Sequence, residues 1–223
     1  MKIVILDGHA VNPGDLSWDV LNHFGEVTLY SKTETEAEAI DRIGDHEIVL
    51  VNKVPITENI LNACPNIKLI CVQATGYNIV DTAACAKRGI PVCNVPDYGT
   101  AAVAQFTLAL MLELCHRIGH HDALVHDGKW CASPTFCFWD TPQMELGGKT
   151  LGIIGFGRIG QAVARLAKAF GMQVITHSRT PKESPYAQFV DMDTLLAKSD
   201  FISLHCPLFA ENSKMVNAEF IRK

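Results

Sequence analysis

The chain has 223 residues, 48% of them hydrophobic, and 24 acidic against 19 basic side chains, for a formal net charge of −5. This length accommodates one large domain or two modest domains, and no basic run is present that would attract nucleic acid or an acidic membrane. The longest apolar runs are strand-sized, and the apolar run in MKIVILDGHA is too short for a signal peptide. Eight cysteines without a CxxC pair predict free thiols in a reducing cytoplasm.

The first hundred residues alternate between strand and helix patterns. Strands are predicted at residues 2–8, 26–30, 47–52, 67–74 and 91–96, and helices at residues 15–25, 34–44, 57–65 and 80–89. Strands separated by helices of about ten residues form a parallel sheet with helices on both faces. Residues 1–99 therefore predict a complete α/β domain.

A break at residues 96–100, PDYGT, precedes the longest helical pattern of the chain, at about residues 100–127. A loop rich in aromatic residues and proline follows at residues 129–148. Beyond this loop, strands are predicted at residues 150–155, 173–178 and 201–206, and helices at residues 158–170, 192–199 and 217–223. Residues 100–223 therefore predict a second α/β domain.

The hexapeptide GFGRIG follows a predicted strand and opens a predicted helix, which is the context of a dinucleotide-binding loop. Its first glycine permits the tight turn, the second lets the backbone approach a pyrophosphate, and the third lets the helix pack close to the strand. The helix N-terminus and its dipole then face the anion. The predicted cofactor contacts in this loop are Gly155, Phe156, Gly157, Arg158, Ile159 and Gly160.

The end of the following strand indicates which dinucleotide binds. An acidic residue about twenty positions past the loop accepts hydrogen bonds from the ribose of NAD, whereas this chain has Ser178, Arg179 and Thr180, 18 to 20 positions past Gly160. Two hydroxyl groups and a guanidinium suit a 2′-phosphate, so NADP is predicted to be preferred over NAD. The alternative is that Arg179 is a solvated turn residue and that either dinucleotide binds.

With these motifs, the chain resembles the D-isomer-specific 2-hydroxyacid dehydrogenases, in the glycerate dehydrogenase or hydroxypyruvate reductase branch. The matching segments extend along the whole chain: LDGHAVNPGDLSW, VNKVPIT, VQATGYNIVD, GIPVCNVPDYGTAAVAQ, FCFWD, LGGKTLGIIGFGRIGQAVA and ISLHCPL. The resemblance implies two doubly wound parallel-sheet domains, a flavodoxin-like substrate-binding domain (1–99) and a Rossmann dinucleotide-binding domain (100–223), the second incomplete at its C-terminus. It also implies hydride transfer between NAD(P)H and a small 2-oxo acid, hydroxypyruvate or glyoxylate, with D-glycerate in the reverse direction.

The resemblance also implies a substrate site in the first domain. Backbone N–H groups of the loop ATGYN, around Ala74, Thr75 and Gly76, would hold the substrate carboxylate, and the ammonium group of Lys53 would pair with it. An ordinary strand-to-helix turn and a solvated lysine are the alternatives. The further cofactor contacts that the resemblance implies are Thr100, Val103, His205, Cys206 and Pro207.

Trp139, in the segment FCFWD, would reach the active site of a partner subunit, or would anchor the interface of a homodimer without touching substrate. His116 and His120 stand one helical turn apart, but no Glu or Cys completes a metal site at helical spacing. These histidines, with His121 and His126, are therefore expected at the surface or in an interface, and no metal is expected.

Reduction of a 2-oxo acid also needs a cation, an acid/base group near the operating pH, and a carboxylate that tunes this group. The family supplies them as an Arg, a His and a Glu, which the resemblance places beyond Lys223. No catalytic residue is therefore expected within the 223 residues, and a polypeptide that ends there is expected not to turn over. The alternative is a dinucleotide-sensing interaction protein without turnover, but the substrate loop favours the enzyme.

Overall fold

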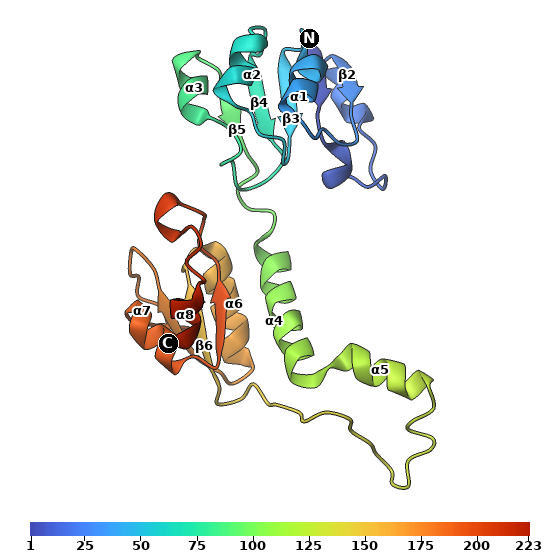
Figure 1. Cartoon of the computed structure of the whole chain (residues 1–223), viewed down its shortest axis with the longest axis vertical. Helices are drawn as coiled ribbons and strands as arrows, with labels where there is room; N and C mark the ends of the chain where they lie inside the picture. Colours follow the sequence, from blue (N-terminus) through green and yellow to red (C-terminus); the bar gives the residue numbers. More distant parts are fainter. The chain divides into compact units, whose positions relative to one another are not determined.

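The computed structural model describes the backbone of residues 1–223 and every side chain except that of Ala210. The chain forms two compact units, Met1–Tyr98 (unit 1) and Gly99–Lys223 (unit 2), and each contains one parallel sheet (Figure 1). The eight cysteines are free thiols, and Cys93 and Cys131 among them are exposed.

Unit 1 is built on a five-stranded parallel sheet in the order β2-β1-β3-β4-β5. Its strands are β1 (Lys2–Ile5), β2 (Glu26–Leu29), β3 (Ile48–Val51), β4 (Leu69–Val72) and β5 (Val92–Cys93). This strand order is that of flavodoxin-like folds, which confirms the predicted class of the first domain. Because the carboxyl ends of parallel strands meet at one edge, the segments that follow β1, β3 and β4 lie together.

Three helices cover one face of this sheet: α1 (Glu36–Ile43), α2 (Glu58–Ala63) and α3 (Thr82–Lys87). Each begins at a residue whose side chain accepts a hydrogen bond from a first-turn N–H group: Thr35, Thr57 and Asp81. Their apolar sides pack on alternate residues of the central strands, and this cluster is the main core of unit 1. The helices thus fix the strands whose carboxyl ends carry the predicted substrate loop.

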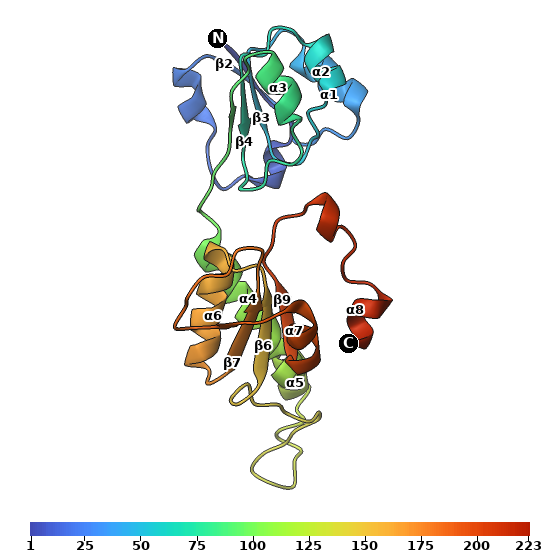
Figure 2. The ribbon, with the colours of Figure 1, turned by 90° about the vertical axis from the view of Figure 1, so that its left-hand side faces the viewer.

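The opposite face of the sheet is covered by a shorter segment, which Figure 2 shows on the other side from α1, α2 and α3. Trp18 and Leu21 pack there on buried Ile3 and Ile5. The prediction of an α-helix at residues 15–25 was wrong, because this segment forms the 3-10 helix η2 (Asp19–His23). The N–H group of Leu21 donates to Trp18 O at 2.9 Å, a tighter i to i+3 bond that suits such a short segment.

Unit 2 contains a four-stranded parallel sheet in the order β8-β7-β6-β9. Its strands are β6 (Thr150–Ile154), β7 (Gln173–His177), β8 (Gln188–Phe189) and β9 (Phe201–Leu204). Read from the first strand outward, this is the 3-2-1-4 order of Rossmann folds, which confirms the predicted class of the second domain. The two-residue strand β8 was not predicted, because its pattern is too short to show periodicity.

Helices pack on both faces of the second sheet, as Figure 2 shows. The helices of unit 2 are α4 (Thr100–His116), α5 (Ile118–His126), α6 (Arg158–Ala169), α7 (Met192–Lys198) and α8 (Ala218–Arg222), together with the 3-10 segment η3 (Ala210–Asn212). α4 and α6 pack against each other and on Leu151 and Ile153, whereas α7 packs on Ile154 and Ile175. Alternate residues of β6 thus face two different helix layers.

The single helix predicted at about residues 100–127 is two helices, which is a correction to the sequence analysis. Arg117 takes a left-handed backbone conformation (φ 46°, ψ 54°) that ends α4, and α5 continues at an angle of 58°. His116 and His120 therefore lie on different helices. No single helix in the described chain is long and apolar enough to cross a membrane, although the bent pair α4–α5 meets the length and composition criterion jointly.

Candidate functional site

The glycine loop of unit 2 joins β6 to α6, and its three glycines meet different surroundings. A Cβ atom on Gly155, whose φ is +95°, would lie 2.6 Å from Cys206 N, and one on Gly160 would lie 2.3 Å from Gly155 O. These two glycines are therefore required by the fold itself. Gly157 differs, because a Cβ atom there would meet nothing within 4 Å. The middle glycine thus leaves open space beside the backbone, as a pyrophosphate cradle requires.

The N-terminus of α6 is suited to an anion. Gly157 is its N-cap residue and provides no capping side chain, and its first turn contains no acidic residue. The helix has 12 residues, so its dipole places partial positive charge at this end. Phe156 is buried and stacks edge-to-face on Phe189, so only the backbone of Phe156 is available to a ligand. The loop therefore fits the pyrophosphate of a dinucleotide.

Three chain segments converge at this loop. The N–H group of Gly155 donates to His177 O at 2.8 Å, and the N–H group of His205 donates to Ile154 O at 2.7 Å. Ser178 follows β7 directly and is half-buried. Because β7 and β9 flank β6, the predicted segments 178–180 and 205–207 lie on either side of the glycine loop. The structure thus brings these two predicted cofactor segments to one edge of the sheet.

Arg179 is exposed, and its guanidinium lies over the ring of Phe209, with Cζ 4.3 Å from the ring centroid. Within the described part of the chain, no carboxylate pairs with Arg179. Thr180 is also exposed. This arrangement leaves the N–H donors of the guanidinium free for an anion.

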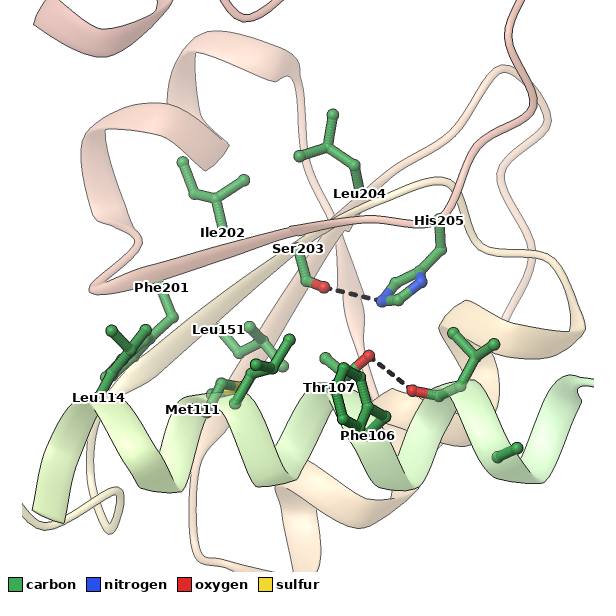
Figure 3. A pocket seen from close by; sticks show the side chains of 13 residues that line it. Phe106, Thr107, Met111, Leu114, Leu151, Phe201, Ile202, Ser203, Leu204 and His205 are labelled. Atoms are coloured by element: carbon green, nitrogen blue, oxygen red, sulfur yellow. Dashed lines mark hydrogen bonds between the residues drawn. The ribbon is translucent and has the colours of Figure 1, made fainter. Parts of the chain in front are cut away.

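A groove of about 710 Å³ runs between α4 and the edge strand β9 (Figure 3). Its lining is mostly apolar and includes Val103 and His205, so two of the predicted cofactor contacts share one groove. The ring Nε2 atom of His205 lies 2.8 Å from Ser203 Oγ, and burial lowers the pKa of this histidine. Burial therefore favours the neutral imidazole. Thr100 begins α4, one turn before Val103.

The predicted carboxylate cradle lies at the carboxyl end of β4. Thr75 Oγ1 donates to Val95 O at 2.9 Å, and Asn94 Nδ2 donates to Thr75 O at 2.8 Å, so the turn is fixed to the segment after β5. The side chain of Ala74 lies in the core. Thr75 and Gly76 are exposed, and no acceptor for their N–H groups occurs among the described residues. Two backbone donors are therefore available to a carboxylate.

A buried carboxylate shapes the neighbouring turn after β3. Asp7, only 5% exposed, accepts hydrogen bonds from the N–H groups of Asn52 at 2.8 Å, Lys53 at 2.5 Å and Val54 at 3.3 Å. Asn52 Nδ2 in turn donates to Gln73 O at 2.7 Å. The ends of β1, β3 and β4 are thus tied together. The side chain of Lys53 is exposed at this edge of the sheet.

Residues 129–146 form an extended arm after α5, and Trp139 on this arm is 71% exposed. Asp140, in the second half of the arm, contacts α5 and also Lys129 at the start of the arm. One of its carboxylate oxygens lies 2.7 Å from His120 Nε2, and the other binds Lys129 Nζ. These contacts lower the pKa of Asp140 to about 2, and the hydrogen bond from Lys129 has the largest effect. Asp140 therefore orders the segment that presents Trp139.

We expect acid to release this arm. A carboxyl group whose pKa is lowered by folding contributes stability above its ordinary pKa of 3.8, and that contribution is lost as the pH falls through about 2. Fluorescence of Trp130 and Trp139 should therefore change over this range, and Asp140→Asn should show the changed signal already at neutral pH. Circular dichroism of the same samples separates release of the arm from global unfolding. An Asp140→Asn spectrum identical to that of the parent protein would contradict this role.

Several site residues were not predicted from the sequence. Asp7 had a signal, since an acidic residue directly after a buried strand is costly unless it is paired. Phe209 had none, because its contact with Arg179 depends on the fold. His116 Nδ1 binds Gln143 Oε1 at 2.9 Å, and the described residues contain no group of three or more metal-ligating side chains placed to hold a metal ion.

Comparison with known proteins identifies the family. Residues 108–223 match the family model "D-isomer specific 2-hydroxyacid dehydrogenase, NAD binding domain". The chain is 50% identical to a hydroxypyruvate reductase of Blautia hydrogenotrophica, covering 100% of this chain and 71% of that protein. It is 36% identical to a glycerate dehydrogenase of Methylorubrum extorquens, covering 100% and 68%.

A solved structure of similar fold supports the same assignment. It is an acyclic imino acid reductase in complex with NADPH and D-Arg, with a TM-score of 0.82 and 31% identity, covering 99% of this chain and 70% of that one. The family model and the relatives confirm the family that the sequence motifs predicted. The chain therefore belongs to the D-isomer-specific 2-hydroxyacid dehydrogenases, whose second domain binds a nicotinamide dinucleotide.

Proposed function

We propose that this chain forms the substrate-carboxylate and dinucleotide sites of an enzyme that reduces a small 2-oxo acid, hydroxypyruvate or glyoxylate, with NAD(P)H and oxidises D-glycerate in the reverse direction; the expected Arg, Glu and His of the reaction are not among residues 1–223. The observation that carries the proposal is the glycine loop, in which Gly157 leaves open space before the uncapped N-terminus of α6. The names of the relatives support a reductase of the hydroxypyruvate and glycerate branch. They do not favour the alternative of a dinucleotide sensor without turnover.

In this proposal the two units have separate tasks. Residues 1–99 bind the substrate carboxylate through the N–H groups of Thr75 and Gly76 and the ammonium group of Lys53. Residues 100–223 hold the dinucleotide at the glycine loop. A dinucleotide held there would supply the hydride for reduction of the 2-oxo carbon and would accept it in the reverse direction. The half-buried His205, whose pKa is lowered by burial, lies with Val103 in the groove beside α4 and would line the nicotinamide end of the site.

The proposal includes a preference for NADP over NAD. Ser178, Arg179 and Thr180 follow β7, at the place where an acidic side chain would bind the ribose of NAD. The guanidinium of Arg179 is exposed and has no carboxylate partner among the described residues, so its donors can bind a 2′-phosphate in bidentate fashion. A carboxylate at this position would instead repel the phosphate.

We expect NADPH to bind about tenfold to a hundredfold more tightly than NADH, because hydrogen bonds between charged partners contribute about 1.5–3 kcal/mol. Arg179→Ala should remove this difference by weakening NADPH alone. The matched control is Arg165→Ala, which removes an exposed arginine from the middle of α6. Titration of the parent protein and of the two variants with both dinucleotides, followed by fluorescence, gives the six constants needed. Equal Kd values for NADH and NADPH in the parent protein would refute the preference.

We also propose that the protein is a cytoplasmic homodimer. The free thiols are those of a reducing compartment. Phe136 and Trp139, which are 90% and 71% exposed on the arm, are aromatic residues of the kind enriched in interfaces. The interactions of Asp140 order this arm without burying either ring. A second copy of the chain would cover them, and the molar mass in solution decides this point.

A further inference from the structure

We propose that Phe209 is a positioning residue for Arg179 and thereby sets the affinity of the protein for a 2′-phosphorylated dinucleotide. The inference rests on the proposed preference for NADP and extends it to a residue that does not itself contact the phosphate. The observation that carries it is the stacking of the Arg179 guanidinium on the ring of Phe209, at 4.3 Å from Cζ to the ring centroid.

The two residues come from opposite sides of the glycine loop. Arg179 follows β7, and Phe209 lies beyond β9, while β6 lies between these strands. A contact between them therefore passes across the carboxyl end of β6, where Gly155 begins the loop. In an open parallel sheet this edge is where a dinucleotide binds. The pair is thus placed at the predicted adenosine end of the site.

The geometry of the stack leaves Arg179 able to bind a phosphate. A cation–π contact uses one face of the planar guanidinium, whereas its N–H donors point outward in the plane of the group. Bidentate binding of a phosphate uses this edge. A guanidinium that lies parallel to the ring of Phe209 would therefore leave its donor edge to the phosphate. A guanidinium that is already oriented also loses less side-chain entropy on binding.

Phe209 is able to orient Arg179 because its own backbone is fixed. The N–H group of Phe209 donates to Asn212 Oδ1 at 2.7 Å, and Asn212 Nδ2 donates to Pro207 O at 2.8 Å. The N–H group of Met215 donates to Asn212 O at 3.2 Å. Cys206 and Met215, one on each side of this turn, pack on the core cluster around Ile154 and Ile175.

A series of contacts therefore connects the core of unit 2 to the predicted phosphate site. Cys206 and Met215 pack on the core at the two ends of the turn, and Asn212 forms hydrogen bonds within it. The ring of Phe209 lies against the guanidinium of Arg179. Phe209 is 37% exposed, and Phe209→Leu keeps an apolar side chain at this position, so the loss of buried apolar area is limited. An effect of Phe209 on dinucleotide selection can therefore be separated from an effect on folding.

The test compares NADPH and NADH binding in four variants: Phe209→Leu, Phe209→Tyr, Arg179→Ala and the double variant Arg179→Ala/Phe209→Leu. Leucine keeps an apolar side chain but removes the π face, and tyrosine restores it. An exposed cation–π contact accounts for about a two- to fivefold change in an equilibrium constant. We expect Phe209→Leu to raise the Kd for NADPH by this factor and to leave the Kd for NADH unchanged. Phe209→Tyr should retain the parental values, and the double variant should equal Arg179→Ala.

Other outcomes overturn the inference. If Phe209→Leu weakens both dinucleotides equally, or adds to the effect of Arg179→Ala, Phe209 acts on the loop and not through Arg179. If Phe209→Leu tightens NADPH binding, the ring obstructs the site. If Arg179→Ala selectively weakens NADPH while Phe209→Leu changes nothing, the inference fails and the proposed NADP preference stands. If Arg179→Ala changes neither constant, the proposed preference fails and this inference fails with it. Thermal melting of each variant identifies any that is misfolded, and Phe209→Tyr keeps the comparison informative in that case.

Discussion

Asp7→Ala is expected to destabilise unit 1 by about 3 kcal/mol or more. The carboxylate accepts hydrogen bonds from three backbone N–H groups, those of Asn52, Lys53 and Val54. Leaving one buried donor without an acceptor costs about 1–3 kcal/mol, so three such donors outweigh the gain from no longer burying a charge. Asp7→Asn keeps one acceptor oxygen and should lose less. Urea unfolding of the three proteins measures the difference.

The control for this prediction is Asp15→Ala, which removes an exposed acidic residue from the same unit. Substitutions of this kind change stability by about 0.5 kcal/mol or less. Amide hydrogen exchange gives a local reading, because the N–H groups of Asn52 and Lys53 should lose protection in Asp7→Ala before those of β5 do. If Asp7→Ala unfolds at the same urea concentration as Asp15→Ala, the carboxylate does not hold the turn that carries Lys53.

The sequence predicted best those features that depend on neighbouring residues. The turn from strand to helix at residues 155–160 was predicted because three glycines at this spacing are typical of one local geometry, and Gly155 does have a positive φ of 95°. The capped helices of unit 1 follow from Thr35 and Thr57 in the same way. The alternation of strands and helices predicted two parallel sheets, and the two fold classes came from the family resemblance.

Features that depend on distant contacts were not predictable. An arginine rarely takes a left-handed conformation, and the nearby Gly119 lies inside α5, so the local sequence does not place the break at Arg117. Contacts of the arm with both helices, such as His116 with Gln143, accompany this bend. The contact between Arg179 and Phe209 likewise joins segments that only the sheet brings together. The candidate residues of the glycine loop and of the segment after β7 thus came from local patterns, the other candidates came from the family resemblance, and only the fold shows the contacts that support them.

Alanine substitutions at the three glycines of the loop should have different effects. Two should lower the stability of unit 2, and the third should lower the affinity for the dinucleotide. Gly155→Ala places a Cβ atom 2.6 Å from Cys206 N on a backbone with positive φ, and Gly160→Ala places one 2.3 Å from Gly155 O. We expect Gly155→Ala to destabilise unit 2 by about 2–4 kcal/mol, because strained backbone and overpacking each cost about 1–3 kcal/mol, and Gly160→Ala by about 1–3 kcal/mol from overpacking alone. The gain in helix propensity at Gly160, about 1 kcal/mol, is too small to compensate.

Gly157→Ala is the matched comparison. Its φ of −75° suits alanine, and the added Cβ atom meets nothing within 4 Å, so we expect a loss of stability of about 1 kcal/mol at most, from the weaker N-cap. The same methyl group would occupy the space through which a pyrophosphate approaches the backbone. Binding of NADH and NADPH should therefore weaken by about tenfold or more, to the same extent for both. Thermal melting and dinucleotide titration of the three variants separate the two roles. Of the three substitutions, only Gly157→Ala changes the space for the ligand without disturbing the packing of α6 on β6. A Gly157→Ala protein that binds both dinucleotides as the parent protein does would therefore show that the pyrophosphate does not lie over this loop.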